Sequence, residues 1–218
     1  MKKITLIYSG GSDSYTLLQH ALNQNFSVDC ITFSYGQKHI KEINFAKQNC
    51  NEHGLKHTLI DIGDPASIFG STSLVDLDNK IPHGSYKEES MKSTIVPNRN
   101  MIFISYAIAY SIAHDINEVW YGAHAGDHFI YPDCRPEFLA SMDTAAGLCD
   151  PSAVSIKAPF INLNKGEIFK IGLALGIDYS KTWTCYEGQE KACGKCGSCV
   201  ERLEAFSDNN TSDPLIYS

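Results

Sequence analysis

Short apolar runs that favour β-structure alternate with helix-like segments along the first half of this chain. The runs occupy residues 4–8, 28–33, 58–62 and 118–121. Between them, apolar residues recur at spacings of three and four, as on one face of a helix. Alternating strands and helices build βαβ units, and such units give a parallel sheet with helices on both faces. The predicted fold is therefore α/β, with a doubly wound, Rossmann-like parallel sheet.

Length and composition fit a globular protein of one or two domains. The chain has 218 residues, of which 43% are hydrophobic and 20% charged, so disordered and coiled-coil architectures are disfavoured. Its net charge of −7 argues against a general nucleic-acid coat. The nearly apolar run at residues 101–113 is too short to span a bilayer, and residues 4–8 are too short for a secretory signal. We expect a cytoplasmic protein with no membrane contact.

A loop rich in glycine and serine links the first predicted strand to the first helix. It consists of Ser9, Gly10, Gly11, Ser12, Asp13 and Ser14. Glycines let a ligand approach the backbone, and the free N–H groups at a helix N-terminus attract an anion such as phosphate. The loop lacks the Lys of a Walker A motif, and the chain has no G-x-G-x-x-G string. The loop predicts phosphate binding, with an ordinary capped βα turn as the alternative.

Four of the eight cysteines lie close together near the end of the chain. They are Cys185, Cys193, Cys196 and Cys199, with the spacing C-x7-C-x2-C-x2-C. Four thiolates suit one tetrahedral Zn²⁺ with no open position, so this zinc site would be structural. An iron–sulfur cluster is the main alternative, and Cys193 with Cys196 also forms a C-x-x-C string that can be redox-active. A disulfide framework is disfavoured, because such frameworks belong to smaller secreted chains.

The loop sequence resembles the pyrophosphate loop of the ATP α-hydrolases, which adenylate their substrates and release pyrophosphate. Four further strings sharpen this resemblance. They are Tyr-Gly-Gln-Lys-His at 35–39, Val-Pro-Asn-Arg-Asn at 96–100, Tyr-Pro-Asp-Cys-Arg-Pro-Glu-Phe at 131–138 and Thr-Trp-Thr-Cys-Tyr at 182–186. Together with the cysteine spacing, they make the chain similar to the 7-cyano-7-deazaguanine synthases from the first strand to Phe206.

The resemblance implies a reaction in two stages. The carboxylate of 7-carboxy-7-deazaguanine would attack the α-phosphate of ATP, and ammonia would then displace AMP to give an amide. A second ATP would dehydrate the amide to the nitrile. Mg²⁺ would accompany ATP and neutralise phosphate charge. The resemblance also implies a homodimer that acts on small molecules and not directly on nucleic acid.

The same resemblance, together with the composition, divides the chain into segments. A late helix is predicted where Asn164 and Glu167 form a capping box and Gly176 stands at the far end. The expected segments are a pyrophosphate-loop (PP-loop) nucleotide-binding domain at 1–180, an insertion loop within it at 63–97, a zinc-binding segment at 181–206 and a flexible tail at 207–218.

Roles in nucleotide binding follow from the resemblance and from charge. The loop at residues 9–14 would hold the ATP phosphates, with Lys38 and His39 near the nucleotide. Asp13 would cap the helix or meet Mg²⁺, because a bare carboxylate repels phosphate. Lys165, at the start of the late helix, would stabilise charge in the transition state.

Other residues are assigned to substrate. Arg99 and Arg135 are candidate catalytic and substrate-binding cations, because a guanidinium grips an oxyanion with two hydrogen bonds. Asp133 would accept protons from the guanine-like edge. His124 and His128 follow the fourth strand, where a parallel sheet presents loops to its ligand.

Three alternatives stay open from the sequence. Residues 122–130 differ from the stretch common in relatives, so a variant that stops at the amide or takes a related deazapurine is one alternative. A second is a tRNA-thiolating or tRNA-adenylating enzyme on the same loop, which would need a basic surface. A third is a zinc-ribbon interaction module on a degenerate nucleotide fold, which the intact loop disfavours.

Overall fold

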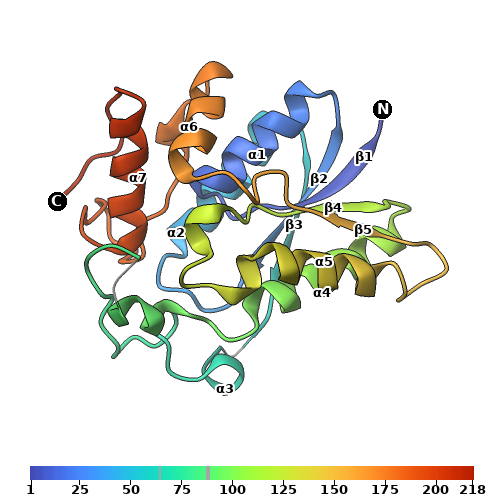
Figure 1. Ribbon diagram of the computed structural model, residues 1–218, viewed down its shortest axis with the longest axis horizontal. Coiled ribbons are helices and arrows are strands. Elements are labelled where there is room, and N and C mark those ends of the chain that lie inside the picture. The colour runs from blue at the N-terminus through green and yellow to red at the C-terminus, as the bar shows by residue number, and fades with distance from the viewer. Residues whose placement is uncertain (64, 87–88) are drawn as a thin grey trace.

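The described residues form a five-stranded parallel sheet (Figure 1). A computed structural model describes residues 1–63, 65–86 and 89–218. The strand order is β3-β2-β1-β4-β5, with β1 in the centre. The strands are β1 (Lys3–Ile7), β2 (Ser27–Ser34), β3 (Lys56–Asp61), β4 (Glu118–Trp120) and β5 (Ser155–Lys157). The predicted doubly wound α/β fold is confirmed.

Helices cover both faces of this sheet (Figure 1). The cores show that α1, α2 and α6 pack on one face and α4 and α5 on the other. The helices are α1 (Ser12–Asn23), α2 (Lys41–Glu52), α3 (Pro65–Phe69), α4 (Arg99–Ala113), α5 (Pro136–Ala146), α6 (Lys165–Ala174) and α7 (Gly197–Asp208). Of the residues described, no stretch makes a helix long and apolar enough to cross a membrane.

The central strand β1 is buried on both faces. Ile4 and Leu6 are fully buried in the core that contains α1. Thr5 points to the other face, where its hydroxyl accepts a hydrogen bond from Ser111 of α4 (2.7 Å). Burying each such aliphatic side chain contributes about 1.5–3 kcal/mol. This packing fixes β1, and with it the position of the loop that follows.

The capping box at the start of α6 is confirmed. The Asn164 side chain accepts from the N–H of Glu167 (2.9 Å), and Glu167 accepts from the N–H of Asn164 (2.8 Å). At the other end, Gly176 has a φ of +72°, the left-handed conformation that commonly ends a helix. The box sets Lys165 as the first residue of α6, so its side chain has a defined direction.

The predicted insertion loop at 63–97 is a packed part of the fold. Leu74 and Met91 are fully buried in the core that contains α4, and Tyr86 is buried beside them. These apolar side chains are spaced irregularly in sequence, so no helix or strand period revealed them. Within this segment, residues 64, 87 and 88 lie outside the described residues.

The segment at 207–218, which the sequence analysis expects to be a flexible tail, contacts the rest of the chain. The helix α7 continues to Asp208, and the rest of the chain folds back on the cysteine segment. Asp213 accepts two hydrogen bonds from Arg202, at 2.6 and 2.9 Å, and Arg202 is fully buried. Ala192 and Ser218 are joined by a backbone hydrogen bond of 2.9 Å. A buried guanidinium needs this carboxylate, which holds the tail in place.

Candidate active site

A cavity of about 220 Å³ lies at the carboxyl end of the sheet. Its wall includes Tyr8, Tyr35 and Tyr121, which follow β1, β2 and β4. Because β1 lies between β2 and β4, the chain crosses over in opposite directions on its two sides. Doubly wound sheets bind their ligands at such a switch point. The first turns of α1, α4 and α6 and part of the cysteine segment complete the wall.

The predicted phosphate loop lies on this wall. Gly10 has a φ of +93°, and a Cβ there would lie 2.2 Å from the backbone oxygen of Glu42, so only glycine fits. The Ser9 hydroxyl accepts from the N–H of Gly11 and lies 3.1 Å from the Ser14 hydroxyl. The backbone N–H of Trp183 donates to the backbone oxygen of Gly10 (3.1 Å), and this bond joins the loop to the cysteine segment. Loop residues that line the cavity are Ser9, Gly11, Asp13 and Ser14.

A network of charged side chains stands beside the loop. Lys165 lies 3.0 Å from Asp13 and 2.8 Å from Glu201, and all three side chains are largely buried. The His124 Nε2 lies 3.7 Å from Asp13 and 3.4 Å from Asp127, while its Nδ1 accepts from the N–H of Gly126 (3.1 Å). The network therefore brings together α1, the loop after β4, α6 and α7.

Interactions within this network determine which of its side chains carry a charge. Burial disfavours the charge on Asp13, but Lys165 outweighs it and holds the pKa of that carboxyl well below its usual range. Burial also opposes the charge on Lys165, yet Asp13 and Glu201 raise the pKa of its ammonium group. Asp127 differs, because burial raises the pKa of its carboxyl. The wall thus presents a fixed cation between carboxylates.

The opposite wall is aromatic. Phe33 and Phe103 stack with ring centroids 4.1 Å apart, and Tyr35 packs against Phe103 at 5.4 Å. The Arg99 Nη1 donates to the Tyr35 hydroxyl (3.1 Å). Burial raises the pKa of Tyr35 to about 12, so its hydroxyl is neutral. Tyr131 also faces the cavity. This wall offers flat apolar faces, neutral hydroxyls and one guanidinium, which suits a planar ligand that carries an anion.

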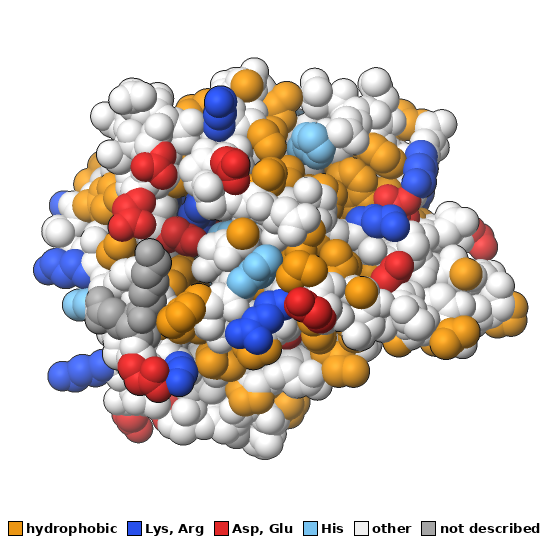
Figure 2. Space-filling view, viewed as in Figure 1, with side chains coloured by type: hydrophobic (Ala, Val, Ile, Leu, Met, Phe, Trp, Pro, Cys, Tyr) orange, Lys and Arg blue, Asp and Glu red, His pale blue; other side chains and the backbone are white. Residues whose placement is uncertain are grey.

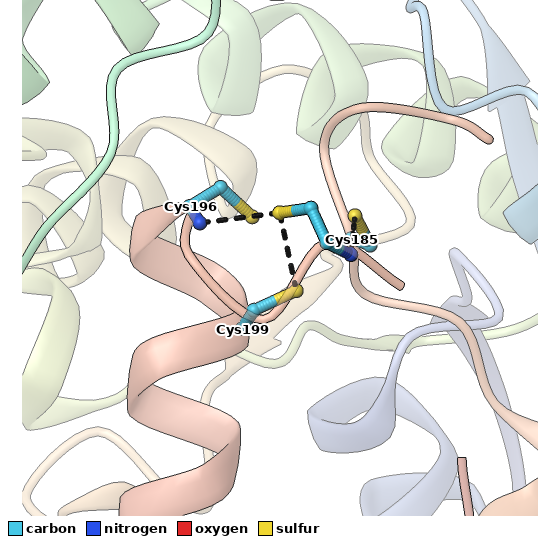
Figure 3. Close-up of side chains that lie close together, drawn as sticks. Cys185, Cys196 and Cys199 are labelled. Carbon is cyan, nitrogen blue, oxygen red and sulfur yellow. Dashed lines mark hydrogen bonds between the residues drawn. The ribbon is translucent and has the colours of Figure 1, made fainter. Parts of the chain in front are cut away.

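The four predicted metal ligands converge. All four cysteine Sγ atoms lie within 4.8 Å of one another, and all four side chains are buried. Figure 3 shows the sulfur atoms of Cys185, Cys196 and Cys199 turned toward a common point, with Cys199 on α7. The N–H groups of Lys195 and Cys196 donate to the Cys193 sulfur (3.4 and 3.3 Å). This arrangement can hold a metal ion.

The family model described as "Queuosine biosynthesis protein QueC" matches residues 3–210, which is nearly the whole chain. The chain belongs to the QueC family. The resemblance derived from the sequence motifs is therefore confirmed.

Curated relatives of this QueC family member align along their whole length. The "7-cyano-7-deazaguanine synthase 2" of Colwellia psychrerythraea is 54% identical over 218 residues, which are 100% of each chain. The "7-cyano-7-deazaguanine synthase" of Psychromonas ingrahamii is 53% identical over 216 residues, 99% of this chain and 98% of the relative. Among solved structures, NMN synthetase from Francisella tularensis has a TM-score of 0.55 at 14% identity and covers 96% of this chain and 77% of that one. This last likeness concerns the fold alone.

Not all of the predicted site residues reach the cavity of this QueC family member. Arg99, His39, His124 and Lys165 line it. The predicted site residues that do not line the cavity are Gly10, Ser12, Lys38, His128, Asp133 and Arg135.

The contacts of these residues explain their placement. The Asp133 carboxylate accepts from the N–H of Asn100 (3.1 Å) in the first turn of α4, so it stabilises that helix end. Arg135 is exposed and donates to the His128 oxygen (2.9 Å). Lys38 donates to the backbone oxygen of Asn79 in a separate depression.

Asp13 does not cap α1, which was one of the two roles expected for it. Gly11 occupies the N-cap, no side chain caps this helix end, and the Asp13 carboxylate turns to Lys165. Folding brings Lys165 close to Asp13, so the carboxylate pairs with this ammonium group and not with the N–H groups of its own helix end.

Several residues of the site had no signal in the sequence analysis. Glu201 lies in α7, 188 positions after Asp13, and completes the same network. Tyr121 and Thr184 each present a hydroxyl that is buried without a hydrogen-bond partner among the described residues. Thr184 falls within a quoted family string, which was the available hint. Glu201 has no local motif, so only the packing of α6 against α7 reveals it.

Proposed function

We propose that this protein is a 7-cyano-7-deazaguanine synthase. It uses ATP to convert 7-carboxy-7-deazaguanine and ammonia to the nitrile, through an acyl-adenylate and an amide. The observation that carries the proposal is the 54% identity, over both whole chains, to a protein of that name. The site supports it, because a phosphate loop and a guanidinium on an aromatic wall face one cavity.

The loop side of the cavity is our proposed nucleotide site. The N–H groups of the first turn of α1 and the hydroxyls of Ser9 and Ser14 would hold phosphate oxygens. Lys165 would face the charge that develops as pyrophosphate leaves. One oxygen of Asp13 is buried without a hydrogen-bond partner among the described residues, which fits a Mg²⁺ ligand. Asp13 and Asp127 would hold Mg²⁺ that arrives with ATP, and this ion would neutralise phosphate charge.

The aromatic side is our proposed deazaguanine site. Tyr35 and Phe103 offer ring faces on which a planar base can stack, and Arg99 would pair with the substrate carboxylate. The substrate carboxylate would then lie beside the first turn of α4, where Arg99 stands. Holding the two anions together while water is excluded would limit hydrolysis of the acyl-adenylate.

We propose that the four cysteines hold a structural Zn²⁺. A tetrahedral ion with Zn–S bonds of about 2.3 Å separates its sulfurs by roughly 3.8 Å. Cys193 and Cys199 are 3.9 Å apart at sulfur, which fits one ion. A multi-iron cluster would need its thiolates farther apart. A C-x-x-C redox role for Cys193 and Cys196 is less well supported, because both are buried and close to two further thiols.

We also propose an oligomeric state and a location for the enzyme. We propose a homodimer on the strength of the family resemblance, which sedimentation of the purified protein tests. A nucleic-acid partner is not supported, since the net charge is −7 and Figure 2 shows Lys and Arg scattered among Asp and Glu on the face in view. We place the enzyme in the cytoplasm, where eight free cysteines stay reduced.

The test is mass spectrometry of the zinc-loaded protein with ATP, Mg²⁺, ammonium and 7-carboxy-7-deazaguanine. We expect AMP and the nitrile. Accumulation of the amide alone would replace the proposal with the amide-forming alternative and point to residues 122–130. An untouched carboxylate with no AMP would overturn the proposed substrate.

A further inference from the structure

One ring nitrogen of His39 is held by a carboxylate, and the other has no hydrogen-bond partner in the described part of the chain. Its Nε2 lies 3.3 Å from an oxygen of Glu42, and that oxygen also accepts from Gln37 (3.3 Å). The carboxylate therefore assigns the ring proton to Nε2 and leaves the lone pair on Nδ1. This Nδ1 is buried and has no hydrogen-bond partner among the described residues, and His39 lines the cavity with 4% of its surface exposed.

The second histidine and the lysine of the cavity wall are already engaged. His124 is the second histidine among the lining residues, and both of its nitrogens have protein partners. Lys165 is held as a cation between Asp13 and Glu201. A histidine of the cavity wall that is oriented by a carboxylate and keeps its second nitrogen unpaired is the arrangement that general bases use.

The surroundings of His39 keep this nitrogen in place. Tyr186 packs against the ring at 5.4 Å between centroids, and Tyr35 meets it edge-on at 6.5 Å. Glu42 lies in the first turn of α2, which fixes the carboxylate. The charged or titratable groups that face the ring are thus Glu42, Tyr35 and Tyr186, of which both phenols have pKa values raised by burial.

We propose that His39 is the general base for the attack of ammonia on the acyl-adenylate. This inference rests on the proposed function. The nitrogen lone pair of ammonia forms the C–N bond, and the carbonyl electrons move to oxygen. Nδ1 removes one proton from the attached nitrogen. The carbonyl then re-forms, the C–O bond to phosphate breaks, and its electron pair leaves with AMP. The products are the amide, AMP and one proton, which the ring releases to solvent.

The experiment separates adenylation from aminolysis in the variant His39→Asn. Exchange of labelled pyrophosphate into ATP, with 7-carboxy-7-deazaguanine and no ammonium, measures the first step. Amide formation with ammonium measures the second. We expect exchange within about threefold of the parent and an amide rate lower by about 100-fold or more, the usual contribution of a general base.

Hydroxylamine supplies a readout that a structural role would not move. It is uncharged at neutral pH, and its adduct loses a proton more readily than that of ammonia. His39→Asn should therefore form the hydroxamate at close to the parental rate. His53→Asn is the matched control, because His53 is exposed at the far end of α2 and should behave as the parent in all three assays. Glu42→Gln should lower the amide rate less than His39→Asn does.

Three results would overturn the proposal. Equal loss of pyrophosphate exchange and amide formation in His39→Asn would make His39 a nucleotide-binding residue. An unchanged amide rate, or a hydroxamate rate that falls as far as the amide rate, would exclude the base role. Failure of the proposed function looks different, since the parent protein itself would then show no exchange. Zinc content and melting temperature of each variant confirm that it is folded.

Discussion

The phosphate loop at 9–14 and the C-terminal segment at 181–218 wall the same cavity but are built differently. The loop is shaped by contacts among its own six residues, such as those of Ser9 with Gly11 and Ser14. The C-terminal segment depends on distant partners, namely four cysteines that converge and an Arg202–Asp213 pair. A short motif can therefore specify the first region, whereas the second is specified only by the folded chain.

The largest expected effect comes from breaking the cysteine cluster. Cys199→Ala should abolish metal binding, lower the melting temperature and reduce AMP formation to background, because Trp183 and Thr184 of the same segment line the cavity. Metal analysis and an AMP assay measure this. Cys149→Ala is the control, since that cysteine is exposed and lies outside the cluster. A Cys199→Ala protein with full activity would show that the two regions are independent.

The next effect concerns the contact that joins the two regions. Lys165→Met leaves Asp13 of the loop and Glu201 of α7 without their shared cation. We expect AMP formation to fall about 100- to 1000-fold, and stability to fall by about 3 kcal/mol. Lys170→Met removes an exposed lysine of the same helix and should change neither. Steady-state kinetics and urea unfolding test both variants, and equal behaviour of the two would remove Lys165 from the mechanism.

Within the C-terminal segment, Asp213→Ala should cost about 3 to 4 kcal/mol, because Arg202 is left buried and unpaired. Urea unfolding measures the change. Glu204→Ala alters an exposed acid of α7 and serves as the control. Adding Arg202→Met should recover part of the lost stability. If Asp213→Ala unfolded like the control, the tail would not be held by this pair.

Within the loop, Gly10→Ala should cost about 2 to 3 kcal/mol and raise the KM for ATP. Its Cβ would meet the Glu42 backbone at 2.2 Å, and the φ of +93° is unfavourable for alanine. Gly54→Ala is the matched control, because its φ is +62° but nothing lies within 4 Å, so strain of about 1 kcal/mol is the whole cost. Equal losses of stability in the two variants would show that the loop can move to accept a Cβ at Gly10.

The smallest effect is a pH dependence of stability. The pKa of Asp13 is lower in the folded protein than in the unfolded chain, so its contribution is present above the unfolded pKa and is lost as pH falls through the folded value. Asp127 has a raised pKa and works in the opposite direction. Urea unfolding from pH 6 to pH 3 should show Asp13→Asn losing less stability than the parent. A steeper loss in the variant would reverse this assignment.

The sequence predicted those features whose cause is local. Residues 9–14 indicated the loop, the Asn164 capping box indicated the start of α6, and four strands followed from apolar runs. The cysteine spacing indicated a metal site, and the sulfurs do converge. In each case the residues responsible are neighbours in the chain or repeat with a short period, so the sequence displays them together.

The remaining features depend on contacts that only folding creates. The strand β5 contains one apolar residue among its three, so no apolar run marked it, and it joins β4 only after the intervening helix α5. Asp133 belongs to one of the family strings, but its carboxylate contacts the first turn of α4 and does not line the cavity. The polar composition at 207–218 suggested a loose tail. The sequence does not show that Asp213 pairs with Arg202, which is buried in α7.

The hydrogen bond from Trp183 to Gly10 also bears on how the enzyme is made. The phosphate loop leaves the ribosome long before the segment that closes the cavity, because Trp183 lies far downstream of Gly10 in the sequence. Contacts across so many intervening residues form late, since the whole connecting chain must be ordered first. A nascent chain therefore carries the loop without a finished pocket, and ATP cleavage begins only after the cysteine segment has also been synthesised and has folded.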